Sequence, residues 1–223
     1  SFMSKVILIV AAHTDDETLG CGGTIAKHVA LGDTVYAVFL ADGVKSRQDA
    51  TPNDLEARCS ASENALEILG IKSSFMLTFP DQRMDTVPML DIVQKLEHIL
   101  NEIKPQVIYT HHDGDLNLDH RITHQATLTA CRPQPGHFVK EIYSYEVRSA
   151  TDWSVGHLNY FEPNYYVDIS DFWDVKKSAL NAYALEMRPK PHSRSVEAVD
   201  ANSIVRGCEV GLHRAEAFKL LRK

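Results

Sequence analysis

The sequence predicts an α/β fold: a Rossmann-like, mostly parallel sheet with helices on both faces. Through the first 147 residues, short apolar runs alternate with helix-like segments. This alternation is typical of parallel strands that are joined by covering helices. With 44% hydrophobic and 24% charged residues, the chain has the composition of an ordinary globular protein and can build a core of useful size.

The strands and helices can be predicted in order along the chain. Residues 6–10 form an apolar, β-branched run of the kind that is typical of a buried strand. Residues 52–69 carry the clearest helix signals, because Thr51 suits the N-cap, Pro52 the first helical position and Gly70 the C-cap. We expect strands at residues 5–11, 34–41, 74–79, 106–110 and 141–147, and helices at residues 23–31, 52–69, 88–103 and 119–131.

The pattern changes after Val147, where a polar and aromatic stretch without clear period begins. No flexible linker separates this part from the rest, so we predict one domain over residues 1–223, with a core at about residues 4–147 and a C-terminal elaboration at residues 148–223. Within the elaboration we expect an edge strand at residues 165–169, helices at residues 175–186 and 196–208, and a last short helix at residues 214–221.

Charge and composition argue against several classes of function. The net charge of −7 argues against nucleic acid or an anionic membrane as the main partner. No apolar stretch approaches the roughly 20 residues of a membrane span. The four cysteines form no C-x-x-C pair, so we expect free, buried thiols in a reducing compartment rather than a cysteine zinc site. Since the N-terminus lacks a signal-peptide pattern, we expect a cytoplasmic location.

Two clusters of ionisable residues follow predicted strands. The first, Ala12-His13-Thr14-Asp15-Asp16-Glu17, comes directly after the first apolar run, and the second, at residues 111–120, comes after the fourth. Crowded carboxylates are costly unless something positive lies among them, and a divalent metal ion is the simplest candidate. In the doubly wound strand order 3-2-1-4-5, strands 1 and 4 are neighbours at the point where ligands bind. The fold therefore predicts that the two clusters meet.

A set of three metal ligands can be drawn from these clusters. Catalytic zinc usually takes three protein ligands and keeps a fourth position for water. His13 and Asp16 can reach one ion from a single turn, and His120 can supply the third ligand. The same set resembles the triad of non-haem iron enzymes, so Fe²⁺ or another divalent ion stays open beside Zn²⁺. Taken singly, each cluster is explained as well by a solvated turn or a helix cap.

The two clusters together resemble the motifs of the PIG-L/LmbE-like deacetylase family. Residues 12–17 are similar to the family's A-H-P-D-D-E signature, with Thr14 in place of proline, and residues 115–120 are similar to its D-x-H-x-D-H motif, with Asn117 in place of the first histidine. Arg58 and Glu63, followed by Leu69-Gly70, resemble its substrate-side helix.

This resemblance implies a zinc-dependent enzyme that removes an N-acetyl group from an amino-sugar derivative. It implies His13, Asp16 and His120 as the ligands of one zinc ion per chain, and Asp15 as the general base. The substitution at Asn117 affects the acid step, because an asparagine amide donates a hydrogen bond but cannot deliver a proton. Either Asn117 acts as a neutral donor to the oxyanion, or another histidine takes over, with His111, His112 and His192 as candidates.

Other polar residues are candidates for contacts with the substrate. Asp81 follows the third predicted strand and can bind sugar hydroxyls, although a solvated turn explains it equally well. Arg194 or Arg121 can pair with a phosphate on a nucleotide- or lipid-linked substrate, and His192 lies beside Arg194. The aromatic residues between Trp153 and Trp173 suit sugar stacking, burial or an interface between copies of the chain. The oligomeric state stays open.

Three alternatives to deacetylation remain at this stage. The same metal set can serve a hydrolase of another amide or ester, or an iron oxygenase. Outside catalysis, the chain can be a sugar-binding module with a structural metal. Asp15 argues against the last, since a structural site has no need of an unliganded carboxylate beside its metal.

Overall fold

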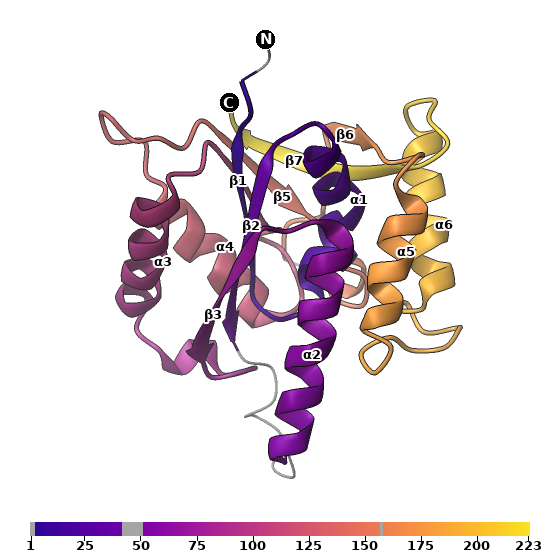
Figure 1. Cartoon of the computed structure of the whole chain (residues 1–223), viewed down its shortest axis with the longest axis horizontal. Helices are drawn as coiled ribbons and strands as arrows, with labels where there is room; N and C mark the ends of the chain where they lie inside the picture. Colours follow the sequence, from indigo (N-terminus) through magenta and orange to yellow (C-terminus); the bar gives the residue numbers. More distant parts are fainter. Residues whose placement is uncertain (1–2, 42–50, 157) are drawn as a thin grey trace.

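The computed structural model describes residues 3–41, 51–156 and 158–223, which build a mostly parallel sheet. Its strand order among the described residues is β3-β2-β1-β4-β5-β7-β6 (Figure 1). Strands β1 to β5 pair in parallel, while β7 runs antiparallel to both of its neighbours. The strands are β1 (Val6–Ala11), β2 (Thr34–Ala41), β3 (Ser73–Phe79), β4 (Val107–His111), β5 (Glu141–Tyr145), β6 (Tyr165–Asp168) and β7 (Ala215–Arg222).

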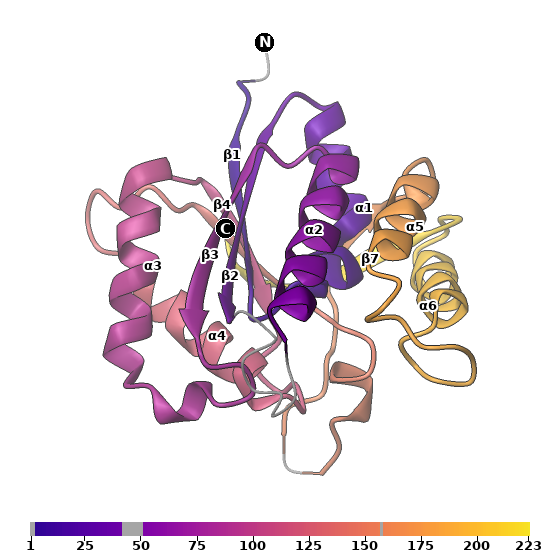
Figure 2. The ribbon, with the colours of Figure 1, turned by 60° about the horizontal axis from the view of Figure 1, so that its bottom comes forward.

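Helices cover both faces of this sheet (Figures 1 and 2). Successive residues of β1 point to opposite faces, so Ile7 and Ile9 join one core cluster while Leu8 and Val10 join the other. The first cluster lies under α1 (Asp16–Ala30), α2 (Pro52–Leu69), α5 (Trp173–Ala182) and α6 (Val196–Cys208), and the second under α3 (Met89–Ile103) and α4 (Leu118–Ala130). No helix among the described residues is long and apolar enough to cross a membrane.

The predicted fold class and the order 3-2-1-4-5 are confirmed, as is the edge strand after residue 164. The predicted helix at residues 214–221 is wrong, because this segment is strand β7, inserted between β5 and β6. Its alanine, leucine and lysine content favours a helix locally. Pairing on both sides overrides that preference, and Phe218 is fully buried in the core. The last predicted helix of the sequence thus contributes to the sheet.

The first helix also differs from its prediction, since α1 begins at Asp16 and not near residue 23. The stretch Gly20-Cys21-Gly22-Gly23 therefore lies inside the helix, where Cys21 has the non-helical φ of −146°. Small residues are required here, because a Cβ on Gly20 would collide with the Tyr145 ring and one on Gly23 would come within 2.7 Å of Ile169. As predicted, the cysteines are free, but burial is wrong for two of them: Cys208 is exposed and Cys59 half-buried.

A buried ion pair joins the two parts of α1 across this break. Lys176 of α5 and Glu216 of β7 lie 2.6 Å apart, each with a nearly inaccessible side chain. Lys176 Nζ donates to the carbonyl of Leu19, which ends the first part of the helix. Glu216 accepts from the backbone N–H groups of Gly23 and Thr24, which begin the second part. The pair thus satisfies backbone groups that the break in α1 would otherwise leave unpaired.

We expect Lys176→Met to lower the free energy of unfolding by about 3–5 kcal/mol, because it leaves the Glu216 charge buried without its partner. The double variant Lys176→Met/Glu216→Gln should recover part of this loss. Lys177→Met, on the exposed neighbouring lysine, should change stability by no more than about 0.5 kcal/mol. Urea unfolding of the three variants measures the differences, and equal effects of the two single lysine variants would contradict the role of the pair.

Candidate metal centre

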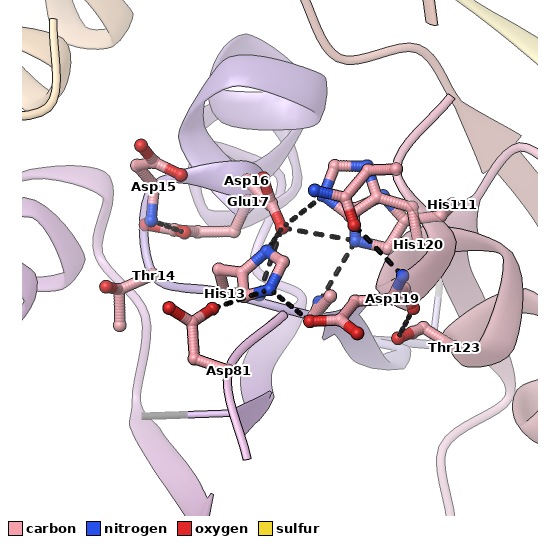
Figure 3. A network of polar contacts seen from close by, with 12 residues as sticks. His13, Thr14, Asp15, Asp16, Glu17, Asp81, His111, Asp119, His120 and Thr123 are labelled. Carbon is pink, nitrogen blue, oxygen red and sulfur yellow. Dashed lines mark hydrogen bonds and ion pairs between the residues drawn. The ribbon is translucent and has the colours of Figure 1, made fainter. Parts of the chain in front are cut away.

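The two polar clusters meet at the carboxyl edge of the sheet. Strands β1 and β4 are hydrogen-bonded neighbours, so the residues that follow them emerge side by side. His13 follows β1, and Asp16 is the first residue of α1. His111 ends β4, and His120 lies in the first turn of α4. Figure 3 shows these side chains converging from the two motifs, as the sequence predicts.

One carboxylate oxygen lies at the centre of the cluster. Asp16 Oδ2 is 3.4 Å from His13 Nδ1, 3.2 Å from His120 Nε2 and 3.3 Å from His111 Nε2 (Figure 3). Two ligand atoms on a tetrahedral zinc ion with ordinary bond lengths lie about 3.3 Å apart. The atoms of His13, Asp16 and His120 are all buried and lie within 4.8 Å of one another. The predicted ligand set therefore fits one divalent ion.

Carboxylates outside this set hold the two imidazoles. The second nitrogen of His13, Nε2, is 2.8 Å from Asp119 Oδ2 and 3.0 Å from Asp81 Oδ1. The second nitrogen of His120, Nδ1, is 3.1 Å from Asp115 Oδ2. Histidine ligands of metals usually donate this nitrogen to a carboxylate, which fixes the ring and its tautomer. The carboxylates beside both rings are therefore at the positions expected for residues that support metal-ligating histidines.

The electrostatics of the cluster favour a cation. Burial lowers the pKa of His13, but hydrogen bonds to carboxylates, first that of Asp119, outweigh it and raise the pKa well above its ordinary value. Burial likewise opposes the charged form of His120, yet the charges of Asp16 and Asp115 raise its pKa to about 9. For Asp16, the charge of His120 overcomes burial and holds the pKa well below the usual range. The same carboxylates would stabilise a divalent ion at this place.

Two further groups of side chains overlap the first. They are His111 with Asp115 and His120, and His13 with Asp81 and Asp119. His111 accepts a hydrogen bond at Nε2 from the backbone N–H of Ala12, and burial lowers its pKa to about 4. An imidazole in this state is a poor proton donor at neutral pH, so His111 does not suit the acid role that the sequence left open for it.

Asp15 lies beside the cluster in a strained turn. Its φ of 93° falls in the left-handed region, which residues other than glycine seldom adopt. The Glu17 carboxylate accepts its backbone N–H, and Arg194 Nη1 lies 3.1 Å from its Oδ2. Burial raises the pKa of Asp15 to about 7 against the opposing charge of Arg194. A carboxyl group with a pKa near neutrality can both accept and release a proton.

Asn117 is the N-cap of α4, with its amide held in one orientation. Its Oδ1 accepts the backbone N–H of Asp119 at 2.9 Å, so its Nδ2 must be the amide atom that faces away from the helix backbone. That nitrogen is 3.3 Å from the side-chain oxygen of Gln82. Asp119, two residues after this cap, directs its carboxylate to His13. Asn117 thus offers a neutral donor at the rim of the cluster.

The other predicted residues lie around the cluster at different depths. Arg58 donates to Thr14 Oγ1 at 3.2 Å and forms an ion pair with Glu186, and Arg194 donates to Ser149 as well as Asp15. Asp81 is buried at His13, unlike the solvated turn that the sequence also allowed. His192 stacks edge-on against Trp153, with ring centroids 5.4 Å apart. Arg121 binds the carbonyls of Asp115 and Leu116, and His112 binds that of Asn159.

Sequence reasoning missed several residues of this site. It predicts no role at the metal for Glu17, Asp115 or Asp119, although all three lie within the quoted motifs. Glu17 is fully buried, accepts a hydrogen bond from Tyr183, and has its pKa raised to about 7 by burial. The only signal in the sequence was that these carboxylates lie within a few residues of predicted ligands. That spacing does not show which imidazole each carboxylate will contact.

Comparison with known proteins identifies the family. A family model described as PIG-L, GlcNAc-PI de-N-acetylase, matches residues 8–131, which is more than half of the chain. This chain belongs to the PIG-L family. The match spans both polar motifs, most of β1 and all of β2, β3 and β4. The resemblance predicted from the two motifs is thereby confirmed.

Individual relatives extend over most of the chain. The Escherichia coli K12 protein named uncharacterized deacetylase YaiS is 32% identical over 185 residues, covering 80% of this chain and 90% of its own length. A Bacillus cereus protein named probable N-acetyl-alpha-D-glucosaminyl L-malate deacetylase 2 is 26% identical, covering 81% and 83%. The structure of the conserved protein TT1542 from Thermus thermophilus superposes with a TM-score of 0.79 at 29% identity, covering 97% and 94%.

We expect the wild-type chain to bind about one zinc ion and His120→Ala to lose it, because that variant removes one of three buried ligands. His98→Ala, which changes an exposed histidine on α3, serves as the control and should keep its metal. Elemental analysis after dialysis against a zinc-containing buffer measures the content. Equal zinc in wild type and His120→Ala would show that the two motifs do not form one metal site.

Proposed function

We propose that this chain is a zinc-dependent N-deacetylase that hydrolyses the N-acetyl group of an amino-sugar derivative. The observation that carries the proposal is the convergence of both family motifs on Asp16, with Asp15 unliganded beside it. Relatives named as deacetylases of N-acetylglucosaminyl compounds support the substrate class. The reaction consumes water, breaks the amide C–N bond and releases acetate and a free amine.

We assign the metal to His13, Asp16 and His120, a donor set that suits zinc and also accommodates Fe²⁺. When bound, such an ion polarises the acetyl carbonyl and lowers the pKa of water. The chain's own contribution at this point is to hold the three ligands rigidly. Asp119 and Asp81 fix the ring of His13, and Asp115 fixes that of His120.

Asp15 is the residue we assign as general base. It removes a proton from the attacking water and then passes that proton to the leaving amine. The Arg194 guanidinium and the left-handed turn fix the direction of its carboxylate. Because one carboxylate can carry the proton through both steps, no separate histidine acid is required.

Asn117 is the residue we assign to the oxyanion. Its Nδ2 donates without carrying charge, and the cap bond to Asp119 prevents the amide from turning round. A preorganised donor of this kind stabilises the negative charge that develops on the carbonyl oxygen. We propose that Arg58, Arg194, Asp81 and His192 contact the sugar. Arg58 donates to Thr14 of the first motif, and Asp81 lies 3.0 Å from His13 Nε2.

Arg194 is the proposed sugar contact with the most constrained position. It lies 179 residues from Asp15 along the chain and reaches it from a turn that is held by bonds to Ser149 and His192. The sequence suggests that this arginine or Arg121 pairs with a phosphate on the substrate, and that role remains a proposal. Because the guanidinium is paired with Asp15, an anion on the substrate would have to share it with a buried carboxylate.

Acetate release is the direct test of this function. We expect the zinc-loaded chain to release acetate from N-acetylglucosaminyl conjugates, and Asp15→Asn to lower kcat by about 10²- to 10⁴-fold while retaining zinc, because an amide cannot accept the water proton. Enzymatic acetate detection with parallel metal analysis measures both. Binding of these conjugates without turnover would favour the sugar-binding module, and release from acetyl esters alone would favour another hydrolase.

Asn117 can be tested apart from its role as a helix cap. Asn117→Asp keeps an oxygen to cap α4 but removes the N–H donor, so we expect kcat to fall by about 10²-fold with stability and zinc content retained. Asn117→Ser, which also caps well, should lose the same activity. Asn117→Ala should add a loss of about 1 kcal/mol in stability. Unaltered kcat in the aspartate variant would remove Asn117 from the mechanism.

A further inference from the structure

A loop outside the matched family region contacts both halves of the candidate centre. It runs from the end of β5 through the short 3-10 helix Thr151–Trp153, whereas the family match ends at residue 131. Thr151 Oγ1 donates to Asp115 Oδ2 at 2.8 Å. Ser149 Oγ accepts from Arg194 Nε at 2.9 Å. The same turn thus contacts Asp115, which pairs with His120, and Arg194, which pairs with Asp15.

The direction of the Thr151 hydrogen bond is fixed by its surroundings. The backbone N–H of Val147 donates to Thr151 Oγ1 at 2.8 Å, and the backbone N–H of Thr151 donates back to the carbonyl of Val147. With one lone pair taken, the hydroxyl directs its hydrogen to the Asp115 carboxylate, which can only accept. The threonine is therefore held as a donor.

Asp115 is fully buried, and each of its oxygens has a defined partner. Oδ1 accepts the backbone N–H of Asn117 at 2.8 Å, and Oδ2 accepts the Thr151 hydroxyl and lies 3.1 Å from His120 Nδ1, with which it forms an ion pair. These bonds leave the carboxylate one orientation. A metal ion held at His120 Nε2, the nitrogen beside Asp16, requires the ring proton to be on Nδ1, the nitrogen that faces the Asp115 carboxylate.

We propose that Thr151 is a positioning residue for the metal: through Asp115 it fixes the tautomer and ring orientation of His120. The proposal rests on the metal site of the proposed function. It adds to that site a residue that makes no contact with the ligand atoms themselves, from a loop that neither family motif includes. The Ser149 hydroxyl binds Arg194 instead, which makes Ser149 a matched control within the same turn.

The zinc affinity of the purified chain tests this proposal. We expect Thr151→Val to weaken zinc binding by about 10- to 100-fold, the usual effect of losing a residue that supports a ligand. Thr151→Ser, which keeps the hydroxyl, should bind zinc about as tightly as wild type, and so should Ser149→Ala. Competition with a chromophoric chelator measures the dissociation constants, and thermal unfolding of the metal-free proteins reports any damage to the loop.

Each result has one meaning for the proposal. Wild-type affinity in Thr151→Val would overturn it, and so would equal weakening by valine and serine, because that would reflect the loop and not the hydroxyl. A wild-type chain that binds no zinc would also overturn it. Acetate release is measured separately, so that a chain which binds zinc as expected but shows no turnover contradicts the deacetylase function and leaves the role of Thr151 standing.

Discussion

The buried carboxylate of Asp16 is the interaction on which the rest of the site depends. It is almost inaccessible to solvent, and three imidazole nitrogens lie between 3.2 and 3.4 Å from one of its oxygens. A buried charge is tolerated only when partners compensate for its lost hydration. Asp119, Asp81 and Asp115 lie against the other nitrogens of His13 and His120, where carboxylates would strengthen both imidazoles as ligands of the proposed metal ion.

The fold positions this carboxylate by packing α1 closely against Tyr145 of β5. The glycines at the break in α1 allow the approach, and β7 supplies Glu216 to satisfy the backbone there. The strand that was predicted as a helix is thus the element that supports the helix carrying Asp16. Gly23 and Glu216 are 193 residues apart in sequence, yet the Glu216 carboxylate accepts the Gly23 N–H. This bond lets a buried helix break and begin again without unpaired backbone groups.

Much of this arrangement could be predicted from the sequence, and the limits have physical causes. Strand order and the meeting of His13, Asp16 and His120 follow from local patterns and the general rule for parallel sheets. The contact between Asp119 and His13 could not be predicted, because the direction of a side chain at the start of a helix depends on its tertiary neighbours. Strand β7 was missed because its local composition favours a helix and only its two partner strands decide otherwise.

The strained turn at Asp15 explains how the carboxylates of Asp15 and Asp16, adjacent in sequence, can contact different partners. In a regular helix start, Asp15 and Asp16 would project only about 100° apart and could crowd the same ion. The left-handed conformation, which costs on the order of 1–3 kcal/mol, gives Asp15 a different direction from Asp16. The Glu17 carboxylate accepts the Asp15 N–H, and Arg194 binds the Asp15 carboxylate. These two contacts stabilise the strained conformation of Asp15. The turn therefore directs the Asp15 carboxylate to Arg194, as the proposed base requires, while the Asp16 carboxylate faces the imidazoles of His13 and His120.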